Sequence, residues 1–503
     1  MTIGILVIVV GLLCIVGFVA LHGDSDKATD PKPVKQAAPS GLAKFYDQGL
    51  KWTDCGSSRC TWVTVPVDYK KPGGETLRLK VKLRPADDAS PRGLLFINPG
   101  GPGGSGVDFV KSFADKASRA LRENYGIVGF DPRGVGKSTP LKCFDNKGID
   151  AYANSDPDPD TAAEIATFRK FVVDLGDACK ANSGDLAAHV STLEAAKDMD
   201  VLRAVLGQKK LDYYGASYGT QLGATYATEF PKNVGRMVLD GAVDSSLSDE
   251  DQALGQTRGF QRALTSYIAD CVKSSDCPLG SDAKGAETKL SDFLQALDQK
   301  PMKAQDGRLL TESAAFYGIA VTLYDRGYWK YLTQELTAAF NGNPSTMLLL
   351  FDAYSTRQTD GSYGDNSFES ISAVRCLDST KTSTLEQVEK SIPEFEKISP
   401  ALGRASAWAA LGCTDWPLKS DNKQIPISAK GAPPIIVVGT TRDPATPYEW
   451  AQSLAKQLAS GVLVTREGDG HTGFHIGNSC IDDLVDDYFV KDAVPKVGTT
   501  CGE

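Results

Sequence analysis

A serine at the centre of a short glycine motif has the surroundings that best suit nucleophilic chemistry. Ser217 lies in a Gly-x-Ser-x-Gly motif at 215–219, after an apolar run from 211 that predicts a strand and before a segment at 220–230 that predicts a helix. A strand, a tight turn and a helix in this order form a nucleophile elbow, which exposes the serine hydroxyl at the positive end of the helix. A Gly/Ser turn in an unrelated strand–helix unit is the alternative interpretation.

A serine hydroxyl is a weak nucleophile at its ordinary pKa and needs a neighbouring base. The chain has four histidines. His22 lies near the N-terminus and His189 precedes the elbow, whereas the base of such a site follows the serine in the chain. His471 lies in a Gly-rich loop directly after a predicted strand, so it is the predicted base. His475 is expected to be a supporting or surface residue.

An acidic residue is needed to orient the imidazole ring and to stabilise the imidazolium. Asp443 follows the buried strand predicted at 434–439 and is the predicted acid. Asp469 is only two residues from the predicted base, which is too near to orient that ring from a separate loop. Asp415 lies outside the predicted sheet, and Asp240 is expected to be a turn residue.

Two backbone N–H groups are expected to stabilise the oxyanion that forms when the serine attacks a carbonyl. One is the N–H of Tyr218, the residue after the nucleophile. The other comes from the Gly-rich loop at 98–106, from Gly100 or Gly101. This loop lacks the Gly-Lys-Ser/Thr ending of a phosphate-binding loop, which argues against a nucleotide site. The sequence predicts no cofactor.

Strands and helices alternate along most of the chain, which predicts an α/β fold with a mostly parallel central sheet and helices on both faces. Two antiparallel strands, then parallel strands and then a serine elbow is the order of an α/β-hydrolase. The antiparallel hairpin is predicted at 62–69 and 76–84, and buried strands are predicted at 93–98, 125–130, 236–241, 434–439 and 462–466. The helices between and after them are predicted at 162–180, 193–206, 448–459 and 481–490.

A long, mainly helical stretch interrupts this sheet pattern. We interpret it as a large cap inserted over the carboxyl edge of the sheet, where open α/β folds bind ligands. The predicted layout is a first part of the core at 46–244, the cap at 245–430 and the C-terminal part of the core at 431–503. A second domain in tandem is the alternative, but the sheet would then lack its last strands. The helices of the cap are predicted at 252–272, 286–297, 312–325, 331–340 and 385–392.

The apolar segment at 1–21 predicts export, as a signal peptide or as a membrane anchor. A buried core helix is the alternative, but a polar segment with three prolines follows directly, and residues 22–45 are predicted to be a flexible linker. The formal net charge of −9 argues against nucleic-acid binding, which requires a basic surface.

The cysteines also favour an oxidising compartment. Cys14 lies in the apolar segment, and the other ten form an even set with close neighbours along the chain. No Cys-x-x-Cys pair occurs, and only His475 lies near a cysteine, so zinc is disfavoured. The expected disulfides join Cys55 to Cys60, Cys143 to Cys179, Cys271 to Cys277, Cys376 to Cys413 and Cys480 to Cys501.

Four motifs together resemble those of the secreted bacterial tripeptidyl aminopeptidases, which are relatives of proline iminopeptidase. They lie at 98–106, 131–136, 215–220 and 443–447, and the resemblance runs from about residue 52 to the end. Proline iminopeptidases usually carry His-Gly-Gly-Pro-Gly after the third strand, whereas this chain has Asn98-Pro99 before the glycines, as in the tripeptidyl branch. By that alignment the second oxyanion donor is Gly101.

The resemblance implies a serine exopeptidase that releases short peptides, expected to be tripeptides, from free N-termini through an acyl-enzyme. Asp244 and acidic residues of the cap are candidates for holding the substrate ammonium. Some envelope members of this branch are carboxylesterases, so an esterase or lipase on the same scaffold is the alternative. An envelope protein that binds without turnover is a third reading. The expected partners are peptide or ester substrates, and membrane attachment would be through the N-terminal segment.

Overall fold

A computed structural model of the chain describes residues 30–34, 36, 38–421 and 424–502. Pro31–Glu503 form one compact unit, to which the description below refers. The predicted signal peptide or anchor at 1–21 and the first residues of the predicted linker lie outside the described residues. Among the residues that are described, no helix has both the length and the apolarity required of a membrane span.

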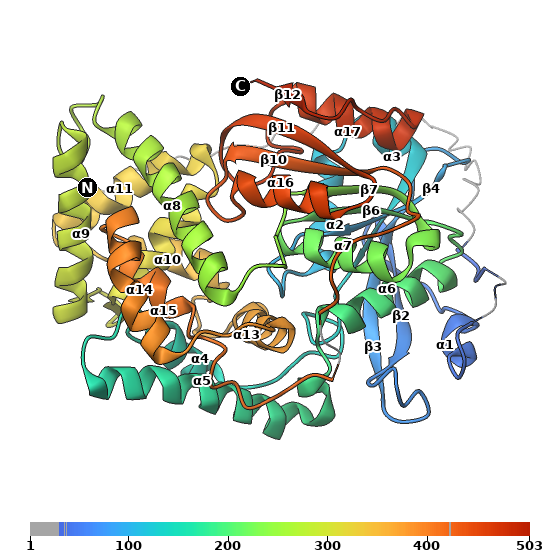
Figure 1. The fold of residues 1–503 in the computed structure, drawn as a ribbon, viewed down its shortest axis with the longest axis horizontal. Coiled ribbons are helices and arrows are strands. Elements are labelled where there is room, and N and C mark those ends of the chain that lie inside the picture. Colours follow the sequence, from blue (N-terminus) through green and yellow to red (C-terminus); the bar gives the residue numbers. More distant parts are fainter. Residues whose placement is uncertain (1–29, 35, 37, 422–423, 503) are drawn as a thin grey trace, which may run out of the picture. The chain divides into compact units, whose positions relative to one another are not determined.

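A ten-stranded sheet forms the centre of this unit (Figure 1). Its first strands are antiparallel, as the alternating pattern predicts, and Trp62 pairs with Lys80 in the hairpin. They are β1 (Thr53–Cys55), β2 (Ser58–Pro66) and β3 (Thr76–Arg84). The remaining strands are parallel to one another, in the spatial order β5 (Tyr125–Phe130), β4 (Gly93–Asn98), β6 (Leu211–Ala216), β7 (Val234–Asp240), β10 (Ile435–Arg442), β11 (Gly461–Asp469) and β12 (Thr499–Cys501). The predicted α/β class is confirmed, and the two three-residue edge strands β1 and β12 were not predicted.

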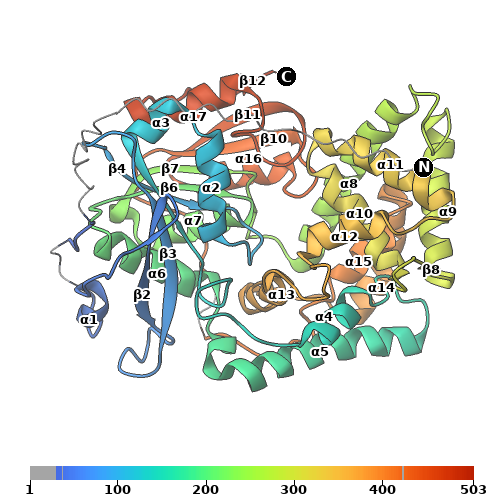
Figure 2. The ribbon, with the colours of Figure 1, turned by 180° about the vertical axis from the view of Figure 1, so that it is seen from behind.

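Helices cover both faces of the sheet, as Figures 1 and 2 show from opposite sides. One face is covered by α6 (Thr192–Val205), α7 (Tyr218–Glu229) and α16 (Tyr448–Gln457). The other is covered by α2 (Gly106–Lys116), α3 (Arg119–Asn124) and α17 (Ser479–Lys491). Each set packs its apolar side chains in a separate cluster against the sheet. Continuous apolar strands such as β5 are buried because helices lie on both sides of them.

A layer of helices lies beside the carboxyl edge of the parallel strands and has hydrophobic clusters of its own (Figure 1). Its members from the predicted cap are α8 (Asp249–Cys271), α9 (Ala283–Gln299), α10 (Glu312–Leu323), α11 (Trp329–Phe340), α12 (Met347–Ser355), α13 (Ser367–Asp378), α14 (Leu385–Ile398) and α15 (Gly403–Ala409). The helices α4 (Asn146–Ala153) and α5 (Ala162–Ser183), which precede the elbow in the chain, pack against this layer as well. Ala153 belongs to its core, and Phe168 contacts Trp408.

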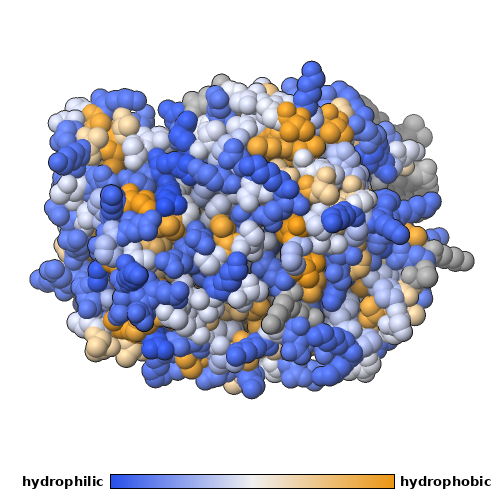
Figure 3. Space-filling model, viewed as in Figure 1, coloured by the Kyte–Doolittle hydropathy of each residue, from blue (hydrophilic) through white to orange (hydrophobic). Residues whose placement is uncertain are grey.

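Hydrophobic residues on the face shown in Figure 3 form small, separate groups among hydrophilic ones. Large apolar side chains that are exposed, such as Leu349 and Val497, belong to distant parts of the chain. The larger apolar surfaces of the helices are therefore turned inward, toward the sheet or toward the core of the cap.

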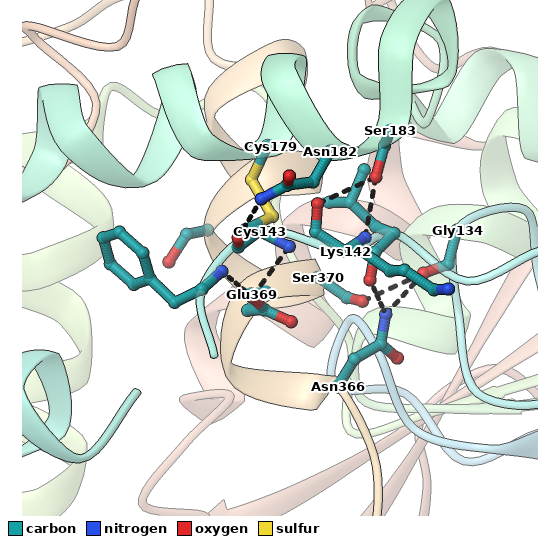
Figure 4. The surroundings of a disulfide bond; sticks show 12 residues. Gly134, Lys142, Cys143, Cys179, Asn182, Ser183, Asn366, Glu369 and Ser370 are labelled. Carbon is teal, nitrogen blue, oxygen red and sulfur yellow. Dashed lines mark hydrogen bonds between the residues drawn. A yellow bond between two sulfur atoms is a disulfide. The ribbon is translucent and has the colours of Figure 1, made fainter. Parts of the chain in front are cut away.

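All five predicted disulfides are formed. Cys143 and Cys179 join the loop before α4 to α5, and Figure 4 shows how this bond meets the cap helix α13. Glu369 of α13 accepts hydrogen bonds from the N–H groups of Cys143 and Phe144. Asn366, just before α13, donates to the carbonyl of Gly134. This disulfide thus stiffens the loop by which the core is bonded to the cap.

We predict that the stabilising effect of these disulfides follows loop length. Cys143 and Cys179 are separated by 36 residues, whereas Cys55 and Cys60 are separated by five. Replacing the first pair by serine should lower the free energy of unfolding by about 4 kcal/mol and replacing the second by about 2 kcal/mol, since a longer loop restricts the unfolded chain more. Urea unfolding without reductant measures both losses, and equal losses would contradict the prediction.

Candidate active site

Ser217 lies at the turn between β6 and α7, so the predicted strand–turn–helix is present. Its φ of +55° is in the left-handed region, which is unfavourable for serine and is held by the surrounding packing. A Cβ at Gly215 would collide with the carbonyl of Gly219, and one at Gly219 would lie 2.9 Å from the carbonyl of Asn98. The two glycines of the motif are therefore required by close backbone contacts.

Asp443 and His471 are in direct contact, although they come from loops after two different strands, β10 and β11. Nδ1 of His471 lies 2.9 Å from both carboxylate oxygens of Asp443. The carboxylate is fully buried and accepts the N–H groups of Ala445, Thr446 and Thr472. These backbone bonds fix the direction in which the carboxylate faces the ring.

The environment of His471 favours a protonated ring. Burial lowers the pKa of His471, but the charge and hydrogen bond of Asp443 and the charge of Asp240 outweigh burial, and the pKa lies above its usual value near 6.5. The backbone N–H of His471 donates to the backbone carbonyl of Tyr324 over 2.8 Å. The rings of the two residues meet edge to face, with their centroids 5.2 Å apart. Tyr324 directly follows α10, so a cap residue also positions the imidazole. No local pattern in the sequence predicts this contact.

Ser217 and His471 both adjoin the end of β7. The N–H of Ser217 donates to the carbonyl of Asp240 over 2.8 Å. At the next residue, a Cβ on Gly241 would lie 3.2 Å from Cε1 of His471. Nε2 of His471 is buried and has no hydrogen-bond partner among the described residues, and no hydrogen bond joins it to the hydroxyl of Ser217 there. The end of β7 therefore lies next to both Ser217 and the ring of His471, whose Nε2 has no partner among the residues described.

The Gly-rich loop after β4 lies against the elbow, because β4 and β6 are neighbours and Asn98 pairs with Gly215. A Cβ on Gly100, whose φ is +96°, would lie 2.8 Å from Cβ of Ser217. In the described part of the chain, no hydrogen bond uses the backbone N–H of Gly101 or of Tyr218. Both residues line the same cavity as Ser217, which is the arrangement expected of two oxyanion donors.

Asp240 does not have the role of a turn residue, which was predicted from the sequence. It is the last residue of β7, is fully buried, and accepts the N–H groups of Gly473 and Phe474 and the hydroxyl of Tyr214. Burial raises its pKa to about 6 even though these donors favour the ionised form. Asp240 therefore anchors the loop that carries His471.

The other acids considered from the sequence are engaged elsewhere. Asp469 forms an ion pair with Arg442, and Asp415 forms one with Arg169. Asp244 accepts hydrogen bonds from Ser246 and Gln457. It lines a separate cavity of about 340 Å³, which does not include Ser217.

The cavity beside Ser217 has a volume of about 400 Å³ and lies between the core and the cap. Aromatic side chains of the cap and of α4 and α5 form much of its wall, in contrast to the polar face of Figure 3. They are Tyr152, Phe168, Phe171, Phe260, Phe316, Tyr317, Tyr324, Tyr354 and Phe368. The acidic residues that line it are Asp156, Asp249 and Asp378. His475, by contrast, packs on Phe113 near α2, as a supporting residue would.

Comparisons with known proteins identify relatives that align with most of the chain. The sequence model of a family described as TAP-like protein matches residues 399–501. Serine protease Hip1 of Mycobacterium tuberculosis is 35% identical, with 97% of this chain and 95% of that protein aligned. Carboxylesterase B of the same organism is 37% identical, with 88% of this chain and 86% of that protein aligned. Tripeptidyl aminopeptidase of Streptomyces lividans is 32% identical, with 93% of this chain and 89% of that protein aligned.

These relatives align with most of the chain, including both parts of the sheet and the helical layer between them. The ten-stranded sheet with its serine elbow agrees with the fold that the sequence predicts. The chain therefore belongs to the bacterial tripeptidyl aminopeptidase family of α/β-hydrolases, and it is a serine hydrolase.

Proposed function

We propose that the protein releases tripeptides from the free N-termini of peptides, with Ser217 as nucleophile, His471 as base and Asp443 as the acid that orients the ring. The observation that carries the proposal is the contact between His471 and Asp443 beside the elbow of Ser217, under a cap that covers the site. The name of the Streptomyces lividans relative supports the product length.

The chemistry follows from this geometry. Nε2 of His471 takes the hydroxyl proton while Oγ of Ser217 bonds to the carbonyl carbon of the substrate. The negative charge that develops on the carbonyl oxygen accepts the N–H groups of Gly101 and Tyr218. The imidazolium, stabilised by Asp443, then donates its proton to the departing amine as the C–N bond breaks. Water releases the acyl group from the serine by the same steps.

Removal of a tripeptide requires that the substrate chain end inside the site. The cap supplies a wall opposite Ser217, and its aromatic lining suits apolar side chains.

The proposed division of the chain is a core at 46–244 and 431–503 with the cap at 245–430, and α4 and α5 pack with the cap. The disulfides support export, which we assign to the apolar segment at 1–21.

A carboxylate in the cavity would hold the substrate ammonium, and Asp249 suits this task best. It is half-buried in the first turn of α8, and among the described residues its side chain accepts a hydrogen bond from the hydroxyl of Ser379 alone. Asp378 is deeply buried and already accepts the N–H and hydroxyl of Thr192. Asp244, one of the candidates from the sequence, lies on another cavity. Asp249 is therefore the proposed amine-binding residue.

Ester hydrolysis is the second candidate activity, because the triad serves both bonds and one relative is named carboxylesterase B. A panel of tripeptide anilides beside short and long acyl esters separates the two by kcat/KM. A binding protein without turnover is the remote alternative. A fluorophosphonate that labels the wild type but not Ser217→Ala supports catalysis, and a folded wild type that resists the label would favour binding alone.

We predict an acid limb in the pH profile that belongs to His471. The base must be neutral, so kcat/KM should rise with pH through a pKa above 6.5, since Asp443 and Asp240 raise that pKa. Asp443→Asn should move the limb to lower pH and lower kcat by about 10⁴-fold. Asp469→Asn removes a nearby carboxylate that pairs with Arg442, and should leave the limb in place. Equal shifts in both variants would contradict the assignment.

We also predict that Asp249→Asn raises KM for peptides with a free N-terminus by about tenfold, the size of a lost hydrogen bond to a charged group. N-acetylated peptides should be poor substrates of the wild type and should not be affected further by the change. Asp244→Asn is the matched control and should leave KM unchanged. Mass spectrometry of products from a mixed peptide library gives the product length, and internal cleavage by the wild type would refute exopeptidase action.

A further inference from the structure

Four carboxylates of the helical layer meet at one point, away from Ser217 and His471. They are Asp156 and Asp158 between α4 and α5, Asp298 in the last turn of α9, and Glu312 in the first turn of α10. Each offers one oxygen, and these oxygens all lie within 4.8 Å of one another. Three segments that are distant in the sequence therefore direct negative charge to the same place.

The local sequence explains how two of the four come together. Residues 156–160 read Asp-Pro-Asp-Pro-Asp. Proline fixes its own φ and holds the preceding residue in an extended conformation, so alternate side chains lie on the same side of the chain. Oδ1 of Asp156 also accepts the N–H of Asp158 over 3.0 Å. This segment is thus built to present Asp156 and Asp158 together.

Glu312 provides independent evidence for a ligand. Its side chain is only 7% exposed, and its Oε2 is buried without a hydrogen-bond partner among the described residues. Buried carboxylate oxygens without partners are rare because leaving water costs them several kcal/mol. Asp298 adds to the negative potential, since it lies at the C-terminal end of α9, where the helix dipole is also negative.

The described part of the chain supplies little positive charge to this cluster. Nε of Arg404 lies 3.9 Å from Asp158, beyond hydrogen-bond distance. Its other nitrogens bond to Asp160 and Glu396, which are acidic residues outside the cluster. One guanidinium is therefore shared among more carboxylates than it can neutralise.

We propose that Asp156, Asp158, Asp298 and Glu312 bind a calcium ion. Calcium prefers carboxylate oxygens at about 2.3–2.6 Å, so oxygens on opposite sides of the ion are about 5 Å apart, as the spacing of this cluster allows. The cluster has no histidine or cysteine, which zinc and other transition metals favour. Magnesium is less suited, since it demands a near-ideal octahedron of closer ligands.

The location favours an ion over the ammonium of a substrate. Of the four acids, only Asp156 lines the cavity of Ser217, so the cluster lies behind the cavity wall. Ser155 and Pro157 on one side and Ser313 and Phe316 on the other belong to that wall. A bound ion would join the segment at 155–158 to α10 and thereby hold two parts of the wall together.

The test compares thermal unfolding of the full-length protein in EDTA and in calcium chloride. At about a hundred times the Kd, calcium should raise the Tm of the wild type by about 3 °C. Glu312→Gln and Asp158→Asn keep the shapes of the side chains and should each weaken calcium binding at least tenfold in calorimetric titrations. Glu389→Gln makes the same change on an exposed position of α14 and should bind calcium as the wild type does.

Several outcomes would overturn the proposal. One is a wild-type Tm that does not respond to calcium up to about 10 mM, a concentration above the Kd of even weak extracellular calcium sites, which is about 1 mM. Another is equal calcium affinity in the wild type, Glu312→Gln and Asp158→Asn. A third is a higher Tm of both variants than of the wild type in EDTA, together with a wild-type Tm that does not respond to calcium, which would indicate a proton shared between Asp158 and Glu312 instead of a metal. These readouts do not depend on hydrolysis, so they are independent of the proposed function.

Discussion

The buried carboxylate of Asp240 connects the parts of the active site that the chain supplies separately. Its oxygens accept the N–H groups of Gly473 and Phe474, just after His471, and the hydroxyl of Tyr214 on β6. Its backbone carbonyl accepts the N–H of Ser217. A buried carboxylate is costly unless it is hydrogen-bonded, so losing any of these donors would destabilise this part of the site. Asp240, at the end of β7, is thus hydrogen-bonded to both the serine elbow and the loop that carries His471.

The cap completes what the sheet begins. Tyr324 accepts the N–H of His471, and Asp378 of α13 bonds to Thr192, whose hydroxyl contacts that of Tyr218. Residues of the cap therefore reach both the imidazole and the residue after the nucleophile. The geometry of the site depends on the inserted helices as well as on the strands, even though Ser217, Asp443 and His471 belong to the core.

Much of this arrangement could be predicted because it depends on local constraints. The motif around Ser217 implies close backbone contacts that only glycine permits, and the long apolar runs imply strands buried on both faces. Asp240 was missed because an acid after a strand has the same local sequence whether it caps a turn or accepts buried N–H groups. Tyr324 and the cluster around Glu312 depend on tertiary contacts between distant segments, which no local pattern encodes. The helix α12 begins with five consecutive apolar residues, so its sequence has little of the one-sided periodicity that marks a surface helix.

The disulfide between Cys143 and Cys179 affects where the cap could open to let peptides in and out. Glu369 and Asn366 attach α13 to the loop that this disulfide stiffens, and Asp378 attaches the other end of the same helix to α6. A rigid swing of the cap that preserved these bonds would use α13 as its hinge. The cavity between the core and the cap would then widen on the side away from α13, and a peptide product would leave by that side.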